Sequence, residues 1–287
     1  MFVIYKKELN SYFNGMMGYV FIAFALAVIG VYMTAVNFSQ AYPNFEYVLD
    51  STRFLFILLM PILTMRTLSE ERRQRTDQLL YSSPISTWSV VIGKFMASLT
   101  VFAVPLLISC AYPILLRQFG AVNLKTAYAG IVGFLLMGGA AIAMGVFLSA
   151  LSESQMVSAV ASFAVLLLCY LMPSLSSMVS ASALTSVIGF SIFFVIAAWM
   201  LYSSTKNKIL AGGTAACGIA ALAAIYFLKP SLLEGTFLSA MNALSVFQRY
   251  DSFIYGMLDL RSIVYFITII ALFIFFTVQI IEKRRWA

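Results

Sequence analysis

The sequence predicts an all-α fold, a polytopic bundle of membrane-spanning helices that forms a single transmembrane domain over residues 1–287. Two observations support this prediction. Of the 287 residues, 62% are hydrophobic and 10% are charged, and the mean hydropathy of +0.96 lies far above that of soluble domains. The apolar residues also fall in blocks of about 20, the length a helix needs to cross roughly 30 Å of hydrocarbon. A soluble chain could not bury so much apolar surface.

The first element is expected to be an amphipathic helix over residues 2–14. Its apolar residues recur at helical spacing, as Phe2, Tyr5, Leu9 and Tyr12 show, while lysines hold part of the remaining surface. A helix of this length is too short to span a bilayer, so we expect it to lie in the headgroup region. The chain start lacks the pattern of a cleaved signal peptide, so the first span is expected to be retained.

Eight spans are expected after this helix. They cover roughly residues 18–36, 53–68, 87–116, 126–150, 156–174, 182–204, 209–228 and 262–281. The third is long, and Pro105 and Pro113 are expected to kink it. The pair at 182–204 and 209–228 is joined only by a short polar turn. If this pair forms a re-entrant hairpin, six true spans remain and both termini stay on the same side.

Lysine and arginine residues near the span ends predict the orientation. With the N-terminus inside, 12 of the 18 lie on the cytoplasmic side and six outside. Because cytoplasmic loops carry an excess of basic residues, this distribution predicts a multi-pass protein of the cell membrane with both termini in the cytoplasm.

Glycine and alanine residues are frequent in the fourth span, at Gly130, Gly133, Gly138, Gly139 and Gly145 among others. Small residues let helices approach closely in lipid. The pattern suits either a subunit interface or close packing inside one bundle.

The segment at 229–261 is too apolar for a free external loop, and helices in the outer leaflet are expected there. Within it, Asp251, Tyr255 and Asp259 are spaced four apart and are expected to share one helical face. An external gate and simple solvation of the acids are both compatible with this spacing.

Signatures of catalysis are missing from the sequence. It contains no histidine, no P-loop, no GxGxxG and no HExxH. The cysteines, Cys110, Cys169 and Cys217, lie far apart in apolar blocks, where packing explains them. Glu153 is the only acid between the fourth and fifth spans and is expected at a helix end. We therefore expect no enzyme activity, no metal site, no cofactor and no nucleic-acid partner in this chain.

The densest charge lies at 69–86, SEERRQRTDQLLYSSPIS, directly after the second span. Ser69 is expected to cap a short cytoplasmic helix with Glu70 and Glu71 in its first turn, and Pro84 is expected to end it. A solvated face would explain the charges alone. Mixed charge on a capped element favours docking to a protein partner.

This run resembles the segment after the second span in ABC-2-type permeases, the membrane subunits of ATP-binding cassette transporters. Six positions match the family pattern E-[KR]-x-x-G-T-x-x-x-L-x-x-x-P-[VI]-[ST]: Glu71, Thr76, Leu80, Pro84, Ile85 and Ser86. Arg75 stands where the family usually has glycine. The resemblance covers the whole chain, and the tail SVFQRYDSFIYGMLDLRSIVYF…IIEKRRWA is similar to the gliding-motility and nitrous-oxide-reductase-maturation branch.

The resemblance implies that the segment at 69–84 is a coupling helix which docks on a separate cytoplasmic ATPase. It implies two ATPase copies, which would bind ATP and Mg²⁺, and export as the direction. The implied docking residues are Glu70, Glu71, Arg72, Arg73, Arg75, Thr76, Asp77 and Leu80. In the family, the external segment before the last span caps the transport route.

Several alternatives stay open at this point. A membrane scaffold that recruits a cytoplasmic protein would need the same docking helix. A membrane-embedded lipid-modifying enzyme would need clustered acids or histidines, which the spans lack. A homodimer, a heterodimer with a second permease, and an added extracellular accessory subunit are all compatible with the sequence. The substrate is not identified, although nearly uncharged spans favour an apolar or amphipathic cargo or force transmission.

Overall fold

The computed structural model describes residues 1–40, 42–76, 85–118, 120–205 and 233–285, with a few single positions from 213 to 226. Every regular element in these residues is helical, and six helices are long and apolar enough to cross a membrane. The all-α membrane bundle is therefore confirmed. The chain divides into two compact units, Met1–Tyr170 with Val246–Ala287, and Leu171–Ser245.

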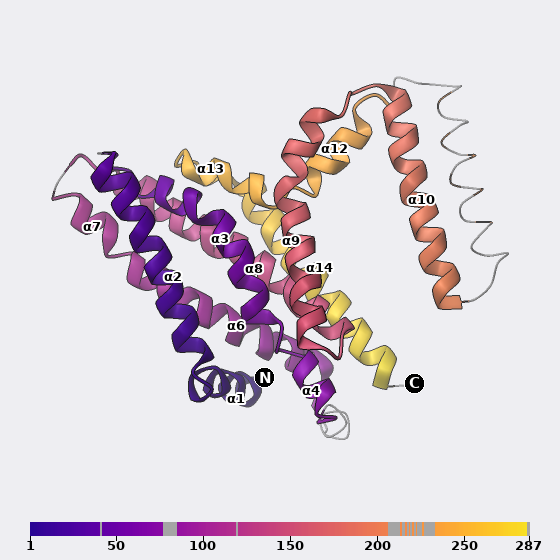
Figure 1. The fold of residues 1–287 in the computed structure, drawn as a ribbon, viewed down its shortest axis with the longest axis horizontal. Helices are drawn as coiled ribbons and strands as arrows, with labels where there is room; N and C mark the ends of the chain where they lie inside the picture. The colour runs from indigo at the N-terminus through magenta and orange to yellow at the C-terminus, as the bar shows by residue number, and fades with distance from the viewer. Residues whose placement is uncertain are drawn as a thin grey trace. The chain divides into compact units, whose positions relative to one another are not determined.

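The first unit contains most of the helices (Figure 1). Their bounds are α1 Phe2–Asn14, α2 Met17–Met33, α3 Glu46–Thr64, α4 Ser69–Arg73, α6 Thr87–Ser109, α7 Tyr112–Leu116, α8 Leu124–Leu151, α13 Asp251–Ile254 and α14 Leu260–Arg285. A π-helical turn, Thr34–Ser39, extends α2, and a 3₁₀ turn, Phe247–Tyr250, precedes α13. Helix α9, Gln155–Met178, begins in this unit. The helix expected at 2–14 is confirmed as α1.

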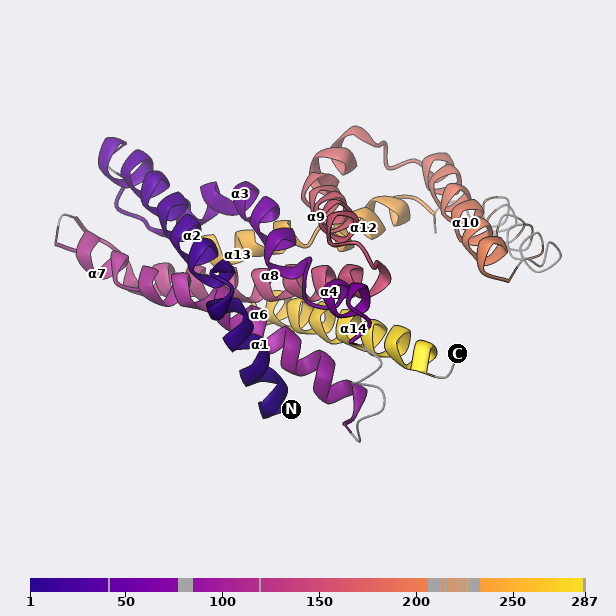
Figure 2. The same ribbon diagram turned by 60° about the horizontal axis from the view of Figure 1, so that its bottom comes forward.

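Helix α8 is the central helix of the first unit. In Figure 2 it passes between α3 on one side and α6 and α14 on the other, and it packs against all three. The ring of Phe134 contacts those of Phe56, Phe102 and Tyr250 at centroid distances of 5.0, 6.1 and 5.7 Å. The core of the unit lies around this aromatic cluster.

The small residues of α8 serve packing within the bundle. A Cβ atom added at Gly138 would lie 2.1 Å from the Phe102 ring, and one at Gly145 would lie 2.2 Å from the Thr64 hydroxyl oxygen. Neighbouring helices thus occupy the space that a side chain would need. Of the two explanations compatible with the sequence, close packing inside one bundle is the one the structure supports for these glycines.

The third expected span is broken just before the second of its two prolines. Helix α6 contains Pro105 and ends at Ser109, and α7 begins at Tyr112 with Pro113 in its first turn. A proline lacks the N–H that would continue the helical ladder, so the chain turns at residues 110 and 111.

The second unit holds the end of α9 together with α10, Ala183–Thr205, and α12, Thr236–Ala243. Phe237 of α12 packs against Phe190 of α10 with ring centroids 5.5 Å apart. Helix α10 corresponds to the span expected at 182–204. The partner expected at 209–228 lies largely outside the described residues, so the choice between two spans and a hairpin stays open.

Candidate functional site

Helix α4, the beginning of the predicted docking segment, is capped by a residue from α8. The hydroxyl oxygen of Ser149 accepts hydrogen bonds from the backbone N–H groups of Leu68 and Ser69, each at 3.1 Å. Ser69 itself is the first helical residue, and its hydroxyl donates to the Met65 carbonyl. The expectation that Ser69 caps this helix is therefore wrong. The cap comes from a helix 80 residues further along the chain, which joins the docking segment to the core.

The end of α4 explains the family's glycine. The N–H of Thr76 donates to the Glu71 carbonyl at 3.0 Å, and the N–H of Arg75 donates to the Arg72 carbonyl at 3.1 Å. This pair of bonds forms a Schellman motif, which needs a left-handed residue just after the helix. Arg75 has φ of +55° and occupies that place. Glycine adopts this conformation without a Cβ clash, so the family pattern and the local backbone agree.

The helix that was expected to run from Ser69 to Pro84 ends earlier, since α4 ends at Arg73. The left-handed turn at Arg75 redirects the chain. Asp77 and Leu80 lie outside the described residues.

Beneath α4 lies a buried ion cluster that sequence reasoning missed. The ammonium group of Lys94, from α6, lies 2.8 Å from a Glu8 carboxylate oxygen, 2.9 Å from one of Glu71, and 2.7 Å from the Thr67 carbonyl. The Lys94 side chain is 1% exposed. A charge so deeply buried must be paired, and here it has three acceptors.

The cluster ties together α1, α4 and α6. Lys94 is one of the twelve basic residues counted on the cytoplasmic side in the prediction of orientation. The signal that could have identified it is its position as a lone cation near the start of an apolar span, since such residues usually face a partner inside the bundle.

The predicted docking residues divide into inward and outward groups. Glu70 forms a two-bond pair with Arg66, at 2.7 and 2.9 Å. Arg72 donates to Glu153 at 2.5 Å and to the Leu151 carbonyl at 3.2 Å. These residues, like Glu71, hold α4 against the bundle, whereas Arg73 and Arg75 are exposed. Glu153, expected at a helix end, does lie just before α9 but also pairs with α4.

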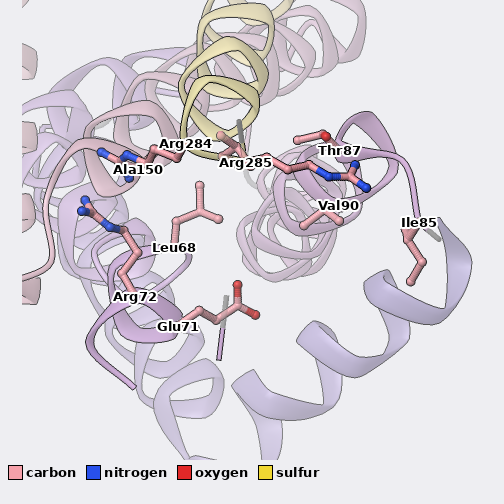
Figure 3. A pocket seen from close by; sticks show the side chains of 10 residues that line it. Leu68, Glu71, Arg72, Ile85, Thr87, Val90, Ala150, Arg284 and Arg285 are labelled. Atoms are coloured by element: carbon pink, nitrogen blue, oxygen red, sulfur yellow. The ribbon is translucent and has the colours of Figure 1, made fainter. Parts of the chain in front are cut away.

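Next to α4, the side chains of four segments line a hollow shown in Figure 3. Its lining is Leu68, Glu71, Arg72, Ile85, Thr87, Val90, Ala150, Ile281, Arg284 and Arg285. Leu68 and Glu71 point into it, and Arg284 donates to the Ala150 carbonyl at 2.7 Å. The end of α14 therefore lies beside the docking segment. This proximity was not expected from the sequence.

The residues predicted for an external gate do not share one helical face. Helix α13 ends at Ile254, and the backbone turns through Gly256 at φ of +73°. Asp251 pairs with Arg53 of α3 at 2.8 Å, Tyr255 is exposed, and Asp259 accepts from the Arg261 N–H and the Ser262 hydroxyl at the start of α14. The expected common face is wrong because a glycine turn separates the three residues.

Arg53 holds the external segment to α3. Besides Asp251, its guanidinium donates to the Phe247 carbonyl at 2.8 Å, pairs with Asp50, and lies 5.3 Å from the centroid of the Tyr250 ring. Burial raises the pKa of the Tyr250 hydroxyl above its usual range. The stretch from Phe247 to Asp251 is thus packed on α3 and is not a free loop.

Comparison with known proteins agrees with this geometry. The family described as ABC-2 family transporter protein matches residues 3–189, about two thirds of the chain, from α1 into α10. The chain belongs to the ABC-2 transporter family. No curated protein and no solved structure matches. This ABC-2 protein is a multi-pass membrane permease subunit of an ABC transporter, and permeases of this family generally work with a cytoplasmic ATPase subunit.

Among the described residues, no group of three or more metal-binding side chains comes together. The matched residues 3–189 include α4 and α6 and nearly all of α1. Lys94 and the two glutamates that bind it therefore lie inside the family region.

Proposed function

We propose that α4 and the residues that follow it to position 84 form a coupling segment on which a separate ATPase docks, and that the complex is an exporter. Two ATPase copies bind ATP and Mg²⁺ and pair with two permeases, this chain and a second copy or paralogue. The complex lies in the cell membrane with both termini of this chain in the cytoplasm. The tail supports placement in the gliding-motility and nitrous-oxide-reductase-maturation branch.

The observation that carries the proposal is the opposite orientation of neighbouring charges on α4 and in the turn that follows it. Arg73 and Arg75 are exposed, where an acidic surface of the ATPase can reach them. Glu71, on the same short helix, is bound to buried Lys94 of α6. If a bound partner displaces α4, α6 is therefore expected to move with it. Breaking the buried Glu71–Lys94 pair instead would cost about 3–5 kcal/mol.

Contacts between α4 and α8 extend this connection. Arg72 binds the Leu151 carbonyl at the end of α8 and Glu153 just before α9, and Ser149 of α8 caps α4. Movement of α4 is thereby transmitted to α1, α6 and α8 together. A plain solvated face would need none of these connections.

The cargo we propose is apolar or amphipathic. Lys94 is the one cation in the interior of α6, and its charge is balanced by Glu8 and Glu71 at the helix start rather than offered to a transport route. Stimulation of ATP hydrolysis by a small polar solute, in the reconstituted complex, would contradict this part of the proposal.

The test uses the tagged chain purified from its native membranes. We expect an ATPase with a P-loop to co-purify, and we expect Arg73→Glu with Arg75→Glu to release it, because two repulsive contacts replace two attractive ones. Arg117→Glu is the control, since Arg117 is also exposed but follows α7 at the far end of the bundle.

Equal ATPase recovery from the wild-type, double-variant and control proteins would contradict docking on α4. Recovery of a cytoplasmic protein without ATPase activity, lost in the double variant, would favour the scaffold alternative instead.

A further inference from the structure

A polar hollow and an apolar groove meet where α1, α2 and α3 come together. Seven residues line the polar hollow: Glu8, Ser11, Tyr12, Met17, Arg66, Thr67 and Glu70. The groove runs on between α2 and α3, where Val20, Phe24, Leu58 and Ile62 are among its lining. Met17 and Arg66 line both, so the two spaces form one amphipathic site.

The size of the polar hollow limits what can enter it. It holds about 40 Å³, enough for a small polar group. A primary ammonium group carries three N–H donors for the two carboxylates, whereas a trimethylammonium group carries none. The groove is ten times larger, at about 410 Å³, and almost wholly apolar.

The charges of the polar hollow suit a zwitterion. Two carboxylates, of Glu8 and Glu70, face one guanidinium, of Arg66. The Nε and Nη2 groups of Arg66 donate to the Glu70 carboxylate. Its Nη1 lies 4.0 Å from the Met17 sulfur, which is a weak acceptor. Arg66 therefore retains donors for a phosphate, and the carboxylates can receive an ammonium. Because Glu8 is also paired with Lys94 and Glu70 with Arg66, the carboxylates of the hollow are already balanced, and a lipid without net charge preserves this balance.

The neighbouring groups of the hollow are already bound. The Tyr12 hydroxyl donates to the Leu63 carbonyl at 3.0 Å and lies 3.0 Å from the Ser98 hydroxyl oxygen, and Glu8 also binds Lys94. Burial raises the pKa of the Tyr12 hydroxyl, which keeps it neutral. The hollow is thus held in shape by contacts that do not depend on an occupant.

The groove has room for an acyl chain. Arg66 and Leu58 are eight residues apart on one helical path, about 12 Å at 1.5 Å per residue. Over this length Val20 and Phe24 of α2 and Leu58 of α3 are 65%, 50% and 48% exposed. A chain lying here would cover these side chains while its head group stays at the Arg66 end.

We propose that this site binds one phospholipid with a primary ammonium head group, phosphatidylethanolamine. Its phosphate accepts from Arg66, its ammonium lies between Glu8 and Glu70, and one acyl chain lies between α2 and α3. Glu8 of α1 also binds Lys94, and Lys94 binds Glu71 of α4. The lipid would therefore contact the same ion cluster that holds α4. The inference concerns the permease alone and does not depend on ATPase docking.

The test is native mass spectrometry of the purified full-length chain with phosphatidylethanolamine, phosphatidylcholine or phosphatidylglycerol added in turn. We expect one phosphatidylethanolamine to be retained about tenfold more tightly than either other lipid, the effect of the added charge-assisted hydrogen bonds. Arg66→Lys keeps the charge beside Glu70 but removes the Nη1 donor, and should weaken retention by about tenfold.

Val20→Trp should fill the groove and abolish this retention. Val31→Trp is the matched control, because Val31 lies on the same helix and both valines are 65% exposed. Equal retention of all three lipids, preference for phosphatidylglycerol, or unchanged retention in Val20→Trp would each overturn the proposal. A dimer of the chain that Val20→Trp dissociates, without bound lipid, would overturn it in favour of a second copy as occupant.

Discussion

Removal of the Lys94 ammonium should destabilise the protein strongly. Lys94→Met keeps the length of the side chain but leaves Glu8 and Glu71 without their shared cation. Both carboxylates are largely buried, with side chains 14% and 16% exposed, and within the described part of the chain only Glu71 has a second cation, Lys7 at 3.8 Å. Breaking a buried pair in this way costs about 3–5 kcal/mol of the free energy of unfolding.

The measurement is thermal unfolding of the purified protein, followed by intrinsic tryptophan fluorescence. At about 2 °C per kcal/mol for a chain of this size, the expected fall in Tm is about 6–10 °C. The same change combined with Glu8→Gln and Glu71→Gln should recover most of the loss, since an apolar and neutral cluster leaves no unpaired charge.

The two variants together separate stability from coupling. The triple variant should fold and still bind the ATPase, because Arg73 and Arg75 are untouched, but its link between α4 and α6 is weaker. A Tm of the single variant within about 1 °C of wild type would refute the reasoning, since it would mean that the cluster is not a set of buried charges.

Two further substitutions test the local geometry, each by Tm of the purified chain. Arg75→Gly should raise the free energy of unfolding by about 1 kcal/mol, because glycine removes the Cβ clash at φ of +55°, whereas Arg73→Gly inside α4 should lower it by about 1 kcal/mol. A loss of stability in both would argue against the Schellman turn. Gly145→Ala should cost about 1–3 kcal/mol, because its methyl group would lie 2.2 Å from the Thr64 hydroxyl oxygen, while Gly30→Ala meets no atom within 4 Å and should gain up to about 1 kcal/mol. The same sign for both glycines would contradict the packing of α8 against α3.

The sequence alone determined the fold class and the positions of most of the described helices. Apolar blocks of span length specify helices because the bilayer allows few other ways to satisfy the backbone. Pro113 located the break in the third span, since a proline acts on its own turn, whereas α6 continues through Pro105. The motif around Glu71 and Thr76 identified α4, even though arginine replaced its glycine. All of these signals are local in the chain.

Only the tertiary structure decided which charges are buried and which are exposed. Lys94 meets Glu8 from 86 residues away, Ser149 caps α4 from 80 residues away, and Arg53 meets Asp251 across 198 residues. Hydropathy and spacing report the neighbours of a residue along its own helix, and they carry no record of which helix packs beside it. The outward Arg73 and the inward Glu71 are two residues apart in the same charged run, and the packing of α1, α6 and α8 around α4 gives them different surroundings.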